Sequence, residues 1–137
     1  MEYRSKFEAK VAKELDKLGV KYEYEAYQFP YTEPLRRNRA RCLTCGGSEL
    51  VRDGWYTPDF WLPEVSNGGL FIETKGRFTA ADRRKMLSVI SENKDETFVM
   101  LFMRDNKIHK RSTTKYSDWC EANGIDYSIG TIKESWL

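Results

Sequence analysis

Two short apolar segments that each carry one acidic residue are the feature of this sequence that most restricts its fold. Segment 55–62 holds Asp59 directly before Phe-Trp, and segment 70–74 holds Glu73 directly after Phe-Ile. Apolar runs of this length, separated by a Ser-Asn-Gly-Gly turn signal, predict two neighbouring strands. Pro58 then lies at an edge or a bulge, where a strand tolerates the loss of an amide hydrogen. We therefore expect the two carboxylates to converge.

The other patterns predict helices and strands in an order typical of an α/β fold. Apolar residues at helical spacing follow a Ser-x-x-Glu capping signal at Ser5 and stop before Gly19. The further expected elements are a strand over 20–27, a helix over 79–93, a strand buried on both faces over 97–103, a short helix over 116–123 and a strand over 125–127. This order predicts a mixed central β-sheet flanked by helices. A length of 137 residues predicts a single domain over 1–137.

The expected strand over 20–27 alternates between apolar and acidic residues. Tyr22 and Tyr24 fall on one face, whereas Glu23 and Glu25 fall on the other. After this strand, prolines and a run of arginines interrupt the pattern, so we expect no regular element before Trp55.

Cysteine content and hydropathy both favour a cytoplasmic protein. The longest apolar run, 98–103, is far too short to span a bilayer. The N-terminal residues are not followed by the apolar stretch of a signal peptide. Three cysteines, an odd number, do not form a secreted disulfide framework.

The formal net charge of +2 hides two basic segments. Residues 36–52 contain five arginines and one glutamate, and residues 104–115 contain five bases and one aspartate, so the rest of the chain is acidic. Such segments are often only solvated loops. Four arginines within 36–41, however, favour contact with phosphates, because the guanidinium group matches phosphate oxygens.

The residue types around the two acids indicate phosphodiester chemistry. Carboxylate oxygens are the ligands that Mg²⁺ prefers, and Mg²⁺ also binds phosphate oxygens. Lys75 follows Glu73 by two residues, so on a strand both side chains point to the same face. This Pro-Asp…Glu-x-Lys pattern is typical of the PD-(D/E)XK nuclease superfamily. The alternative is a pair of surface carboxylates in ordinary ion pairs.

Beyond this motif, the sequence resembles the phage endonuclease I family, the Holliday-junction resolvases of podoviruses. The similarity starts in the first helix and covers nearly the whole chain outside 36–54. The similar stretches are Lys-Tyr-Glu-Tyr-Glu at 21–25, Tyr-Thr-Pro-Asp-Phe at 56–60, Phe-Ile-Glu-Thr-Lys-Gly at 71–76, Asp-Arg-Arg-Lys at 82–85, Tyr-Ser-Asp-Trp-Cys-Glu at 116–121 and Gly-Ile at 124–125, with a fainter match at 134–136.

The resemblance implies a restriction-endonuclease-like fold and a metal site. Asp59, Glu73 and the carbonyl of Thr74 would bind metal, and Lys75 would be the catalytic lysine. Glu8 and Glu23 match further active-site acids of the family, with Glu8 completing the metal site. Each has a structural alternative: Glu8 as the capping partner of Ser5, and Glu23 as a solvent-facing strand acid.

The expected reaction is hydrolysis of a phosphodiester with Mg²⁺, or Mn²⁺, with two ions expected in each active site. The expected substrate is branched DNA, above all the four-way junction. Members of the family are domain-swapped homodimers, which suits a two-fold symmetric junction that needs two cuts. The candidate DNA contacts are Arg36, Arg37, Arg39, Arg41, Arg83, Arg84, Lys85, Lys110 and Arg111. Such phosphate contacts select shape and not sequence.

A bridging segment over 28–54 departs from the family because it is longer and contains Cys42-Leu-Thr-Cys45-Gly-Gly. Two thiolates at this spacing form half of a zinc site. In a swapped dimer, two such turns could share one structural Zn²⁺; the alternative is a reduced or disulfide-linked turn. Cys120 is expected to pack in the core, and His109 has no assigned role.

Two alternative functions stay open at this stage. The first is a non-enzymatic zinc-knuckle module that binds DNA through 36–41, which leaves Asp59, Glu73 and Lys75 without a role. The second is a nuclease of the same superfamily that acts on another DNA target.

Overall fold

A central sheet of five strands organises the computed structural model, which describes residues 2–34, 51–65 and 68–137. The sheet has the order β1-β4-β5-β6-β7, and a separate hairpin pairs β2 with β3. The elements are α1 (Lys6–Lys17), β1 (Glu23–Tyr24), β2 (Phe29–Pro34), β3 (Val51–Tyr56), β4 (Phe60–Leu62), β5 (Leu70–Lys75), α3 (Ala80–Glu92), β6 (Phe98–Phe102), α4 (Tyr116–Ala122), β7 (Tyr127–Ile129) and the 3₁₀ helix η2 (Glu134–Trp136). β1, β4 and β5 are antiparallel neighbours, whereas β5, β6 and β7 run parallel. The predicted mixed sheet is confirmed.

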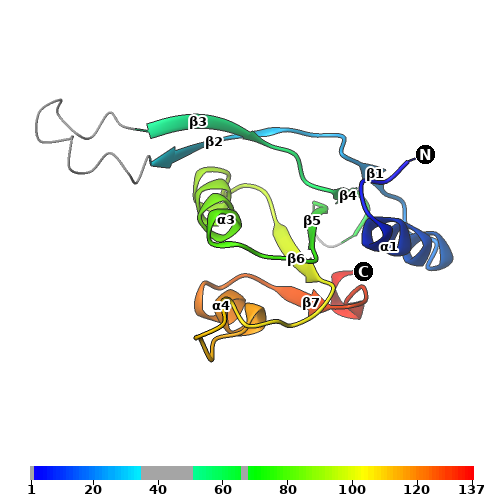
Figure 1. The fold of residues 1–137 in the computed structure, drawn as a ribbon. Coiled ribbons are helices and arrows are strands. Elements are labelled where there is room, and N and C mark those ends of the chain that lie inside the picture. The colour runs from blue at the N-terminus through cyan, green and yellow to red at the C-terminus, as the bar shows by residue number, and fades with distance from the viewer. Residues whose placement is uncertain (1, 35–50, 66–67) are drawn as a thin grey trace, which may run out of the picture.

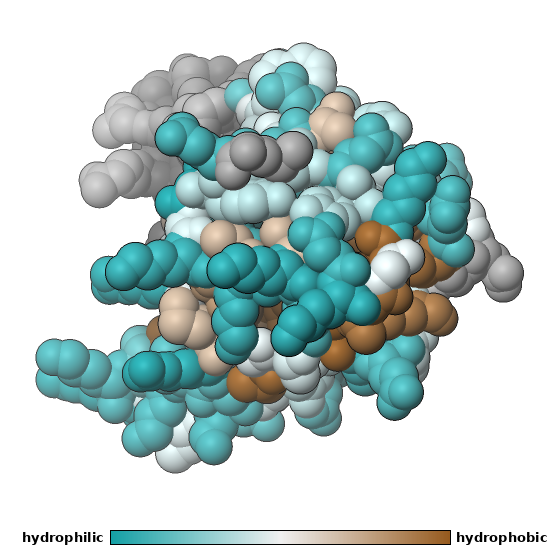
Figure 2. Space-filling model, turned by 90° about the vertical axis from the view of Figure 1, so that its right-hand side faces the viewer, coloured by the Kyte–Doolittle hydropathy of each residue, from teal (hydrophilic) through white to brown (hydrophobic). Residues whose placement is uncertain are grey.

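Helices cover both faces of the sheet, as Figure 1 shows with α1 on one side and α3 and α4 on the other. Alternation along β6 supplies both cores, because Val99 and Leu101 pack with α1, whereas Met100 and Phe102 pack with α3 and α4. All five residues of β6 are buried, as predicted for a strand covered on both faces. The outer side of α1 is polar, and Figure 2 shows mainly hydrophilic side chains on this face of the molecule.

The predicted helices have the expected boundaries because their end signals are local. The Ser5 hydroxyl accepts a hydrogen bond from the Glu8 amide at 3.1 Å, and α1 ends just before Gly19, whose φ is +69°. α3 begins with a capping box between Thr79 and Asp82. No helix in the described part of the chain is long and apolar enough to cross a membrane.

The β2–β3 hairpin corrects two predictions. We expected no element before Trp55 and one strand over 55–62, but β2 pairs with β3, and Pro58 separates β3 from β4. β2 accepts its two prolines because it has a neighbour on one side only. The amide of Thr32 points to Glu92 of α3, at 3.0 Å, and not to β3. Pro30 and Pro34 lie two residues before and after Thr32, so their backbone nitrogens also point away from β3. The prolines therefore cost the hairpin no hydrogen bond between β2 and β3.

Two further strands differ from their predicted ranges. The strand expected over 20–27 shortens to β1, because Glu25 has a left-handed backbone with φ +49°. The last strand is Tyr127–Ile129 and not 125–127, because the Ile125 amide is still bonded to the Cys120 carbonyl at the end of α4. Only parts of the bridging segment 28–54 lie within the described residues.

Candidate functional site

The pairing of β4 with β5 brings the two predicted acids together. Phe60 lies opposite Ile72 in this antiparallel register, so Asp59 and Glu73 are the next neighbours along the ladder. Both are almost buried, with 8% and 7% of their surfaces exposed. Asp59 Oδ2 accepts hydrogen bonds from the Thr74 amide at 2.8 Å and from the Thr74 hydroxyl at 2.7 Å. The expected convergence of the two carboxylates is confirmed.

Burial shifts the acid–base behaviour of both groups. It raises the pKa of Asp59 to about 6, although the Thr74 hydrogen bonds oppose the shift. Burial also raises the pKa of Glu73 to about 7, and the charge of Asp59 adds to this effect. Burial and mutual repulsion therefore disfavour the charged forms of both carboxylates, and a bound cation would stabilise these forms.

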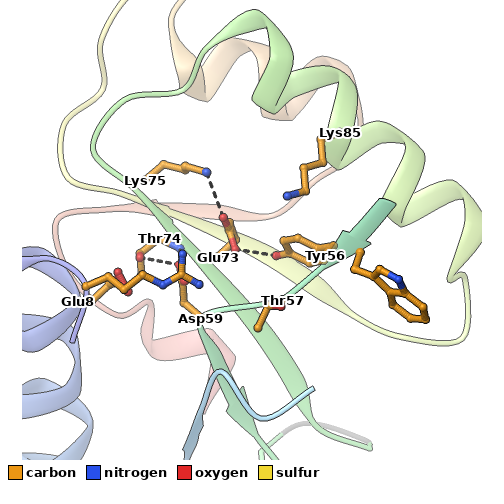
Figure 3. Close-up of a pocket in the computed structure, with 10 residues that line it drawn as sticks. Glu8, Tyr56, Thr57, Asp59, Glu73, Thr74, Lys75 and Lys85 are labelled. Atoms are coloured by element: carbon orange, nitrogen blue, oxygen red, sulfur yellow. Dashed lines mark hydrogen bonds and ion pairs between the residues drawn. The ribbon is translucent and has the colours of Figure 1, made fainter. Parts of the chain in front are cut away.

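The side chain of Glu8 extends from α1 toward Asp59. Its carboxylate is buried and accepts a hydrogen bond from the Tyr24 hydroxyl at 2.6 Å. The Ser5 cap is present on the backbone of α1, and the Ser5 hydroxyl also contacts the Glu8 carboxylate at 3.4 Å. Capping thus accounts for Ser5, whereas the Glu8 carboxylate faces Asp59 (Figure 3).

Glu25 joins this group in place of Glu23. Carboxylate oxygens of Glu8, Glu25 and Asp59 all lie within 4.8 Å of one another. The Glu25 amide donates to the Asp59 carbonyl at 2.9 Å, and its side chain forms an ion pair with Arg4. Strand alternation predicts one face for Glu23 and Glu25, but the left-handed backbone at Glu25 breaks this pattern. Glu23 is exposed on β1 and does not belong to this group of carboxylates, so its catalytic role stays a prediction.

Tyr56 and Lys75 hold the two oxygens of Glu73. The Tyr56 hydroxyl donates to Oε1 at 2.7 Å, and Lys75 Nζ lies 3.2 Å from Oε2. Lys75 Nζ also lies 3.4 Å from Asp82 Oδ1 at the first turn of α3. Burial alone would lower the pKa of Lys75, but Glu73 and Asp82 together raise it, so the ammonium keeps its charge.

Asp82 and Tyr56 are parts of the site that sequence reasoning did not identify. The Thr79-x-x-Asp82 capping signal was visible in the sequence, but the contact of Asp82 with Lys75 depends on where α3 packs. Tyr56 is next to the Thr-Pro-Asp stretch, and its hydroxyl reaches Glu73 only because β3 leads into this edge of the sheet.

Most of these groups line one cavity of about 420 Å³, shown in Figure 3; Tyr24, Glu25 and Asp82 lie outside its lining. Its lining includes three acids, Glu8, Asp59 and Glu73, and two lysines, Lys75 and Lys85. The ammonium of Lys85 lies over the rings of Tyr31 and Tyr56, 5.6 and 5.4 Å from their centres. The cavity is also lined by Arg4, Trp55, Thr57 and Thr74.

The donor set of this cavity suits a hard divalent cation. The carboxylates of Glu8 and Asp59 line the cavity, and the carboxylate of Glu25 lies beside them; all three supply only oxygen ligands, which Mg²⁺ and Mn²⁺ prefer over softer ligands. Glu73 lies on the other side of Asp59 and is already paired with Tyr56 and Lys75. The buried, proton-binding carboxyls are the observation that favours a cation here, because a positive ion offsets their mutual repulsion.

A second groove of about 840 Å³ lies between the start of α3 and the loop over 104–115. Its lining includes Arg77, Arg83, Lys107 and Lys110 and contains no acidic residue. The groove begins at Gly76, directly after Lys75 of the first cavity. A cationic groove whose lining begins one residue after the acidic cavity suits an extended polyanion.

The predicted DNA contacts divide into three groups. Lys85 lines the first cavity, and Arg83 and Lys110 line the second groove. Arg84 is half-buried on α3, and Arg111 is exposed on the loop. The remaining predictions lie outside the described residues: Arg36, Arg37, Arg39 and Arg41, together with Cys42 and Cys45. Cys120 is fully buried in the core, as expected, and burial raises the pKa of its thiol to about 12.

Comparison with known proteins links this site to one family. A family model described as phage endonuclease I matches residues 49–137. The chain is 32% identical to Endonuclease I of Escherichia phage T7 over 136 residues, which covers 98% of this chain and 78% of that protein. It is 36% identical to Endodeoxyribonuclease 1 of Enterobacteria phage T3 over 124 residues, which covers 90% of this chain and 68% of that protein.

The raised carboxyl pKa values predict that the ion-free protein loses stability as the pH rises. Asp59 and Glu73 bind a proton more tightly in the folded chain than in the unfolded chain. The free energy of unfolding should therefore be highest near pH 4 to 5 and should fall until the pH passes about 7. Glu73 alone, shifted from 4.5 to about 7, accounts for roughly 3 kcal/mol of this fall.

Urea unfolding in excess chelator at pH 5, 6, 7 and 8 measures this fall. Glu73→Gln should flatten the pH dependence, because the amide does not titrate. Glu23→Gln, a change of an exposed acid on β1, is the matched control and should keep the wild-type slope. An equal slope in all three proteins would contradict the shifted carboxyls.

Proposed function

Because this chain belongs to the phage endonuclease I family and is therefore an endonuclease, we propose that it hydrolyses phosphodiester bonds in branched DNA with the help of divalent metal ions. The preferred substrate is the four-way junction, which makes the protein a junction resolvase of DNA recombination. The observation that carries the proposal is the convergence of Asp59, Glu73 and Lys75 with Glu8 in one cavity. The location that fits is the cytoplasm of a phage-infected bacterium.

Mg²⁺ or Mn²⁺, two ions per site, is the proposed cofactor. Asp59, Glu73, the Thr74 carbonyl and Glu8 would hold it, with Glu25 as an additional ligand supported by its proximity to Glu8 and Asp59. Bound there, the metal would supply a water nucleophile at neutral pH and offset charge on the scissile phosphate.

Lys75, which lies beside Glu73, acts on the same phosphate. Its ammonium is positioned by Glu73 and Asp82, which hold it on two sides at 3.2 and 3.4 Å. A fixed cation at this place stabilises the negative charge that develops on the phosphoryl oxygens. Lys85 supplies a second cation to the cavity and binds the adjacent phosphate.

The DNA follows the basic surface away from the cavity. The groove with Arg77, Arg83, Lys107 and Lys110 starts one residue after Lys75, so a backbone held at Lys75 continues into it. We add Arg84, Arg111 and the four arginines of 36–41 as further phosphate contacts. Contacts of this kind position DNA without reading bases, so recognition rests on branched shape.

A homodimer would provide the two matched cuts that a symmetric junction needs. In the single chain described here, α1 packs on strands of its own chain, among them β4 and β5. Exchange of α1 and β1 between two copies would reproduce these contacts in trans. The whole of 1–137 then serves as one nuclease domain, with 28–54 as the bridge between copies.

Zinc at Cys42 and Cys45 is proposed as a structural element of that bridge, shared by the two copies. The purified protein should then contain about one zinc per dimer, as measured by elemental analysis together with light scattering. A zinc content far below this value excludes the shared site, and a monomeric mass excludes the bridge.

Removal of a metal-binding carboxylate or of the catalytic lysine should abolish cleavage while DNA binding remains. With Mg²⁺ and a synthetic four-way junction, Asp59→Asn and Lys75→Ala should each reduce the single-turnover rate at least 1000-fold, about 4 kcal/mol of transition-state stabilisation. Junction binding should persist and weaken steeply with salt. The matched control is Asp95→Asn, a change of an exposed acid between α3 and β6, which should cleave normally.

Three outcomes separate the candidate functions. Full cleavage by Asp59→Asn would contradict the assignment of this cavity as the metal-dependent nuclease site. Tight DNA binding by the wild-type protein without cleavage in any divalent ion would favour the non-enzymatic module. Equal cleavage of a junction and a linear duplex would favour a nuclease with another target.

The two acids of β1 and its following turn should differ in their effect on cleavage. Glu25 lies beside Glu8 and Asp59, whereas Glu23 is exposed, so Glu25→Gln should raise the Mg²⁺ concentration needed for half-maximal cleavage at least tenfold. The comparison variant is Glu23→Gln, which removes the acid two residues before Glu25. A larger effect of Glu23→Gln would support Glu23 as the active-site acid and would exclude Glu25 as the additional ligand.

A further inference from the structure

Trp55 is the most exposed of the large apolar side chains in the described part of the chain, with 65% of its surface accessible. It is also one of the residues that line the cavity with Asp59, Glu73 and Lys75. The other three tryptophans are packed. Trp61 stacks on Phe71, Trp119 contacts Phe78, and the Trp136 indole donates to Asp126.

The hairpin explains why the indole is left uncovered. Tyr56 and Trp55 are consecutive in β3, so their side chains point to opposite faces. Tyr56 points into the core, and the ring of Tyr31 lies against Gly54 on the same side, where a Cβ would meet it at 2.7 Å. Trp55 is thus left on the outer face, opposite Pro30. None of the ring–ring contacts among the described residues involves it.

An exposed ring beside a phosphate-hydrolysing centre has a natural partner in nucleic acid. The flat face of a base can stack on an indole, and this contact does not depend on the identity of the base. In a continuous duplex, however, neighbouring base pairs cover both faces of every base. A face becomes available only where stacking is interrupted, as at a branch point, a nick or an unpaired end.

We propose that Trp55 stacks on the uncovered base next to the scissile phosphate and thereby selects branched DNA over continuous duplex. This inference rests on the proposed function, because it assigns the selectivity of the same cavity to one side chain. Trp55 is a positioning residue, since it touches the base and not the reacting phosphate. The acids and lysines act on any phosphodiester, whereas the indole places only interrupted DNA correctly.

The test compares Trp55→Ala with Trp55→Phe on two substrates of equal sequence, a four-way junction and a linear duplex, in Mg²⁺. Trp55→Ala should lower kcat/KM for the junction about tenfold and leave the duplex rate unchanged. Trp55→Phe keeps an aromatic face and should stay within about threefold of the wild-type protein. Because the indole is exposed, all variants should unfold at the wild-type midpoint.

A second measurement reports stacking without cleavage. 2-Aminopurine placed at the branch point, with no metal added, should lose fluorescence when the wild-type protein or Trp55→Phe binds. It should keep its fluorescence with Trp55→Ala. Leu87→Ala is the matched control, because Leu87 is 40% exposed on α3 and lines neither cavity. It should behave as wild type in both measurements.

The outcomes distinguish this inference from the proposed function. A wild-type protein that cleaves no DNA overturns the proposed function, and the 2-aminopurine signal still decides whether Trp55 stacks. A junction preference that survives Trp55→Ala overturns the inference and leaves the nuclease intact. Equal losses on both substrates, or a changed oligomeric state in Trp55→Ala, overturn it as well, because they indicate a general or interfacial role.

Discussion

The antiparallel pairing of β4 with β5 is the constraint on which the rest of the structure depends. It fixes Asp59, directly before β4, and Glu73 of β5 side by side among apolar residues that are mostly buried. Two neighbouring carboxylates in such a place oppose folding unless they are hydrogen-bonded, protonated or paired with a cation. Hydrophobic packing on both faces of the sheet holds them there nevertheless.

The surrounding elements each supply one compensating group. β3 brings the Tyr56 hydroxyl to Glu73, β5 brings the Thr74 amide and hydroxyl to Asp59, and β1 brings the Tyr24 hydroxyl to Glu8. α3 contributes through Asp82, which caps its own helix and holds Lys75. A single side chain thus links the start of α3 to the acidic centre, so the position of this helix and that of the lysine are coupled.

Charge is sorted in space more strongly than the net value suggests. A formal charge of +2 combines an acidic centre with a basic groove whose lining begins at Gly76, the residue after β5. Cations bound at the acids would leave the whole surface more positive toward a polyanion. Near-neutrality is therefore compatible with nucleic-acid binding, because the opposite charges lie on different parts of the surface.

What the sequence by itself determined follows from local rules. Apolar strands carrying Asp59 and Glu73, the two-residue offset of Lys75, and the helix ends at Ser5 and Thr79 are all encoded within a few neighbouring residues. The mixed sheet, the buried β6 strand and the convergence of the two acids could therefore be predicted. Only the tertiary structure brought Glu25 beside Asp59, because a left-handed backbone at Glu25, whose amide donates to the Asp59 carbonyl, overrides strand alternation. It likewise decided that prolines can join a hairpin, that Tyr56 reaches Glu73 and that Trp55 is left uncovered. Each of these depends on which distant segment lies alongside, and no local pattern contains that information.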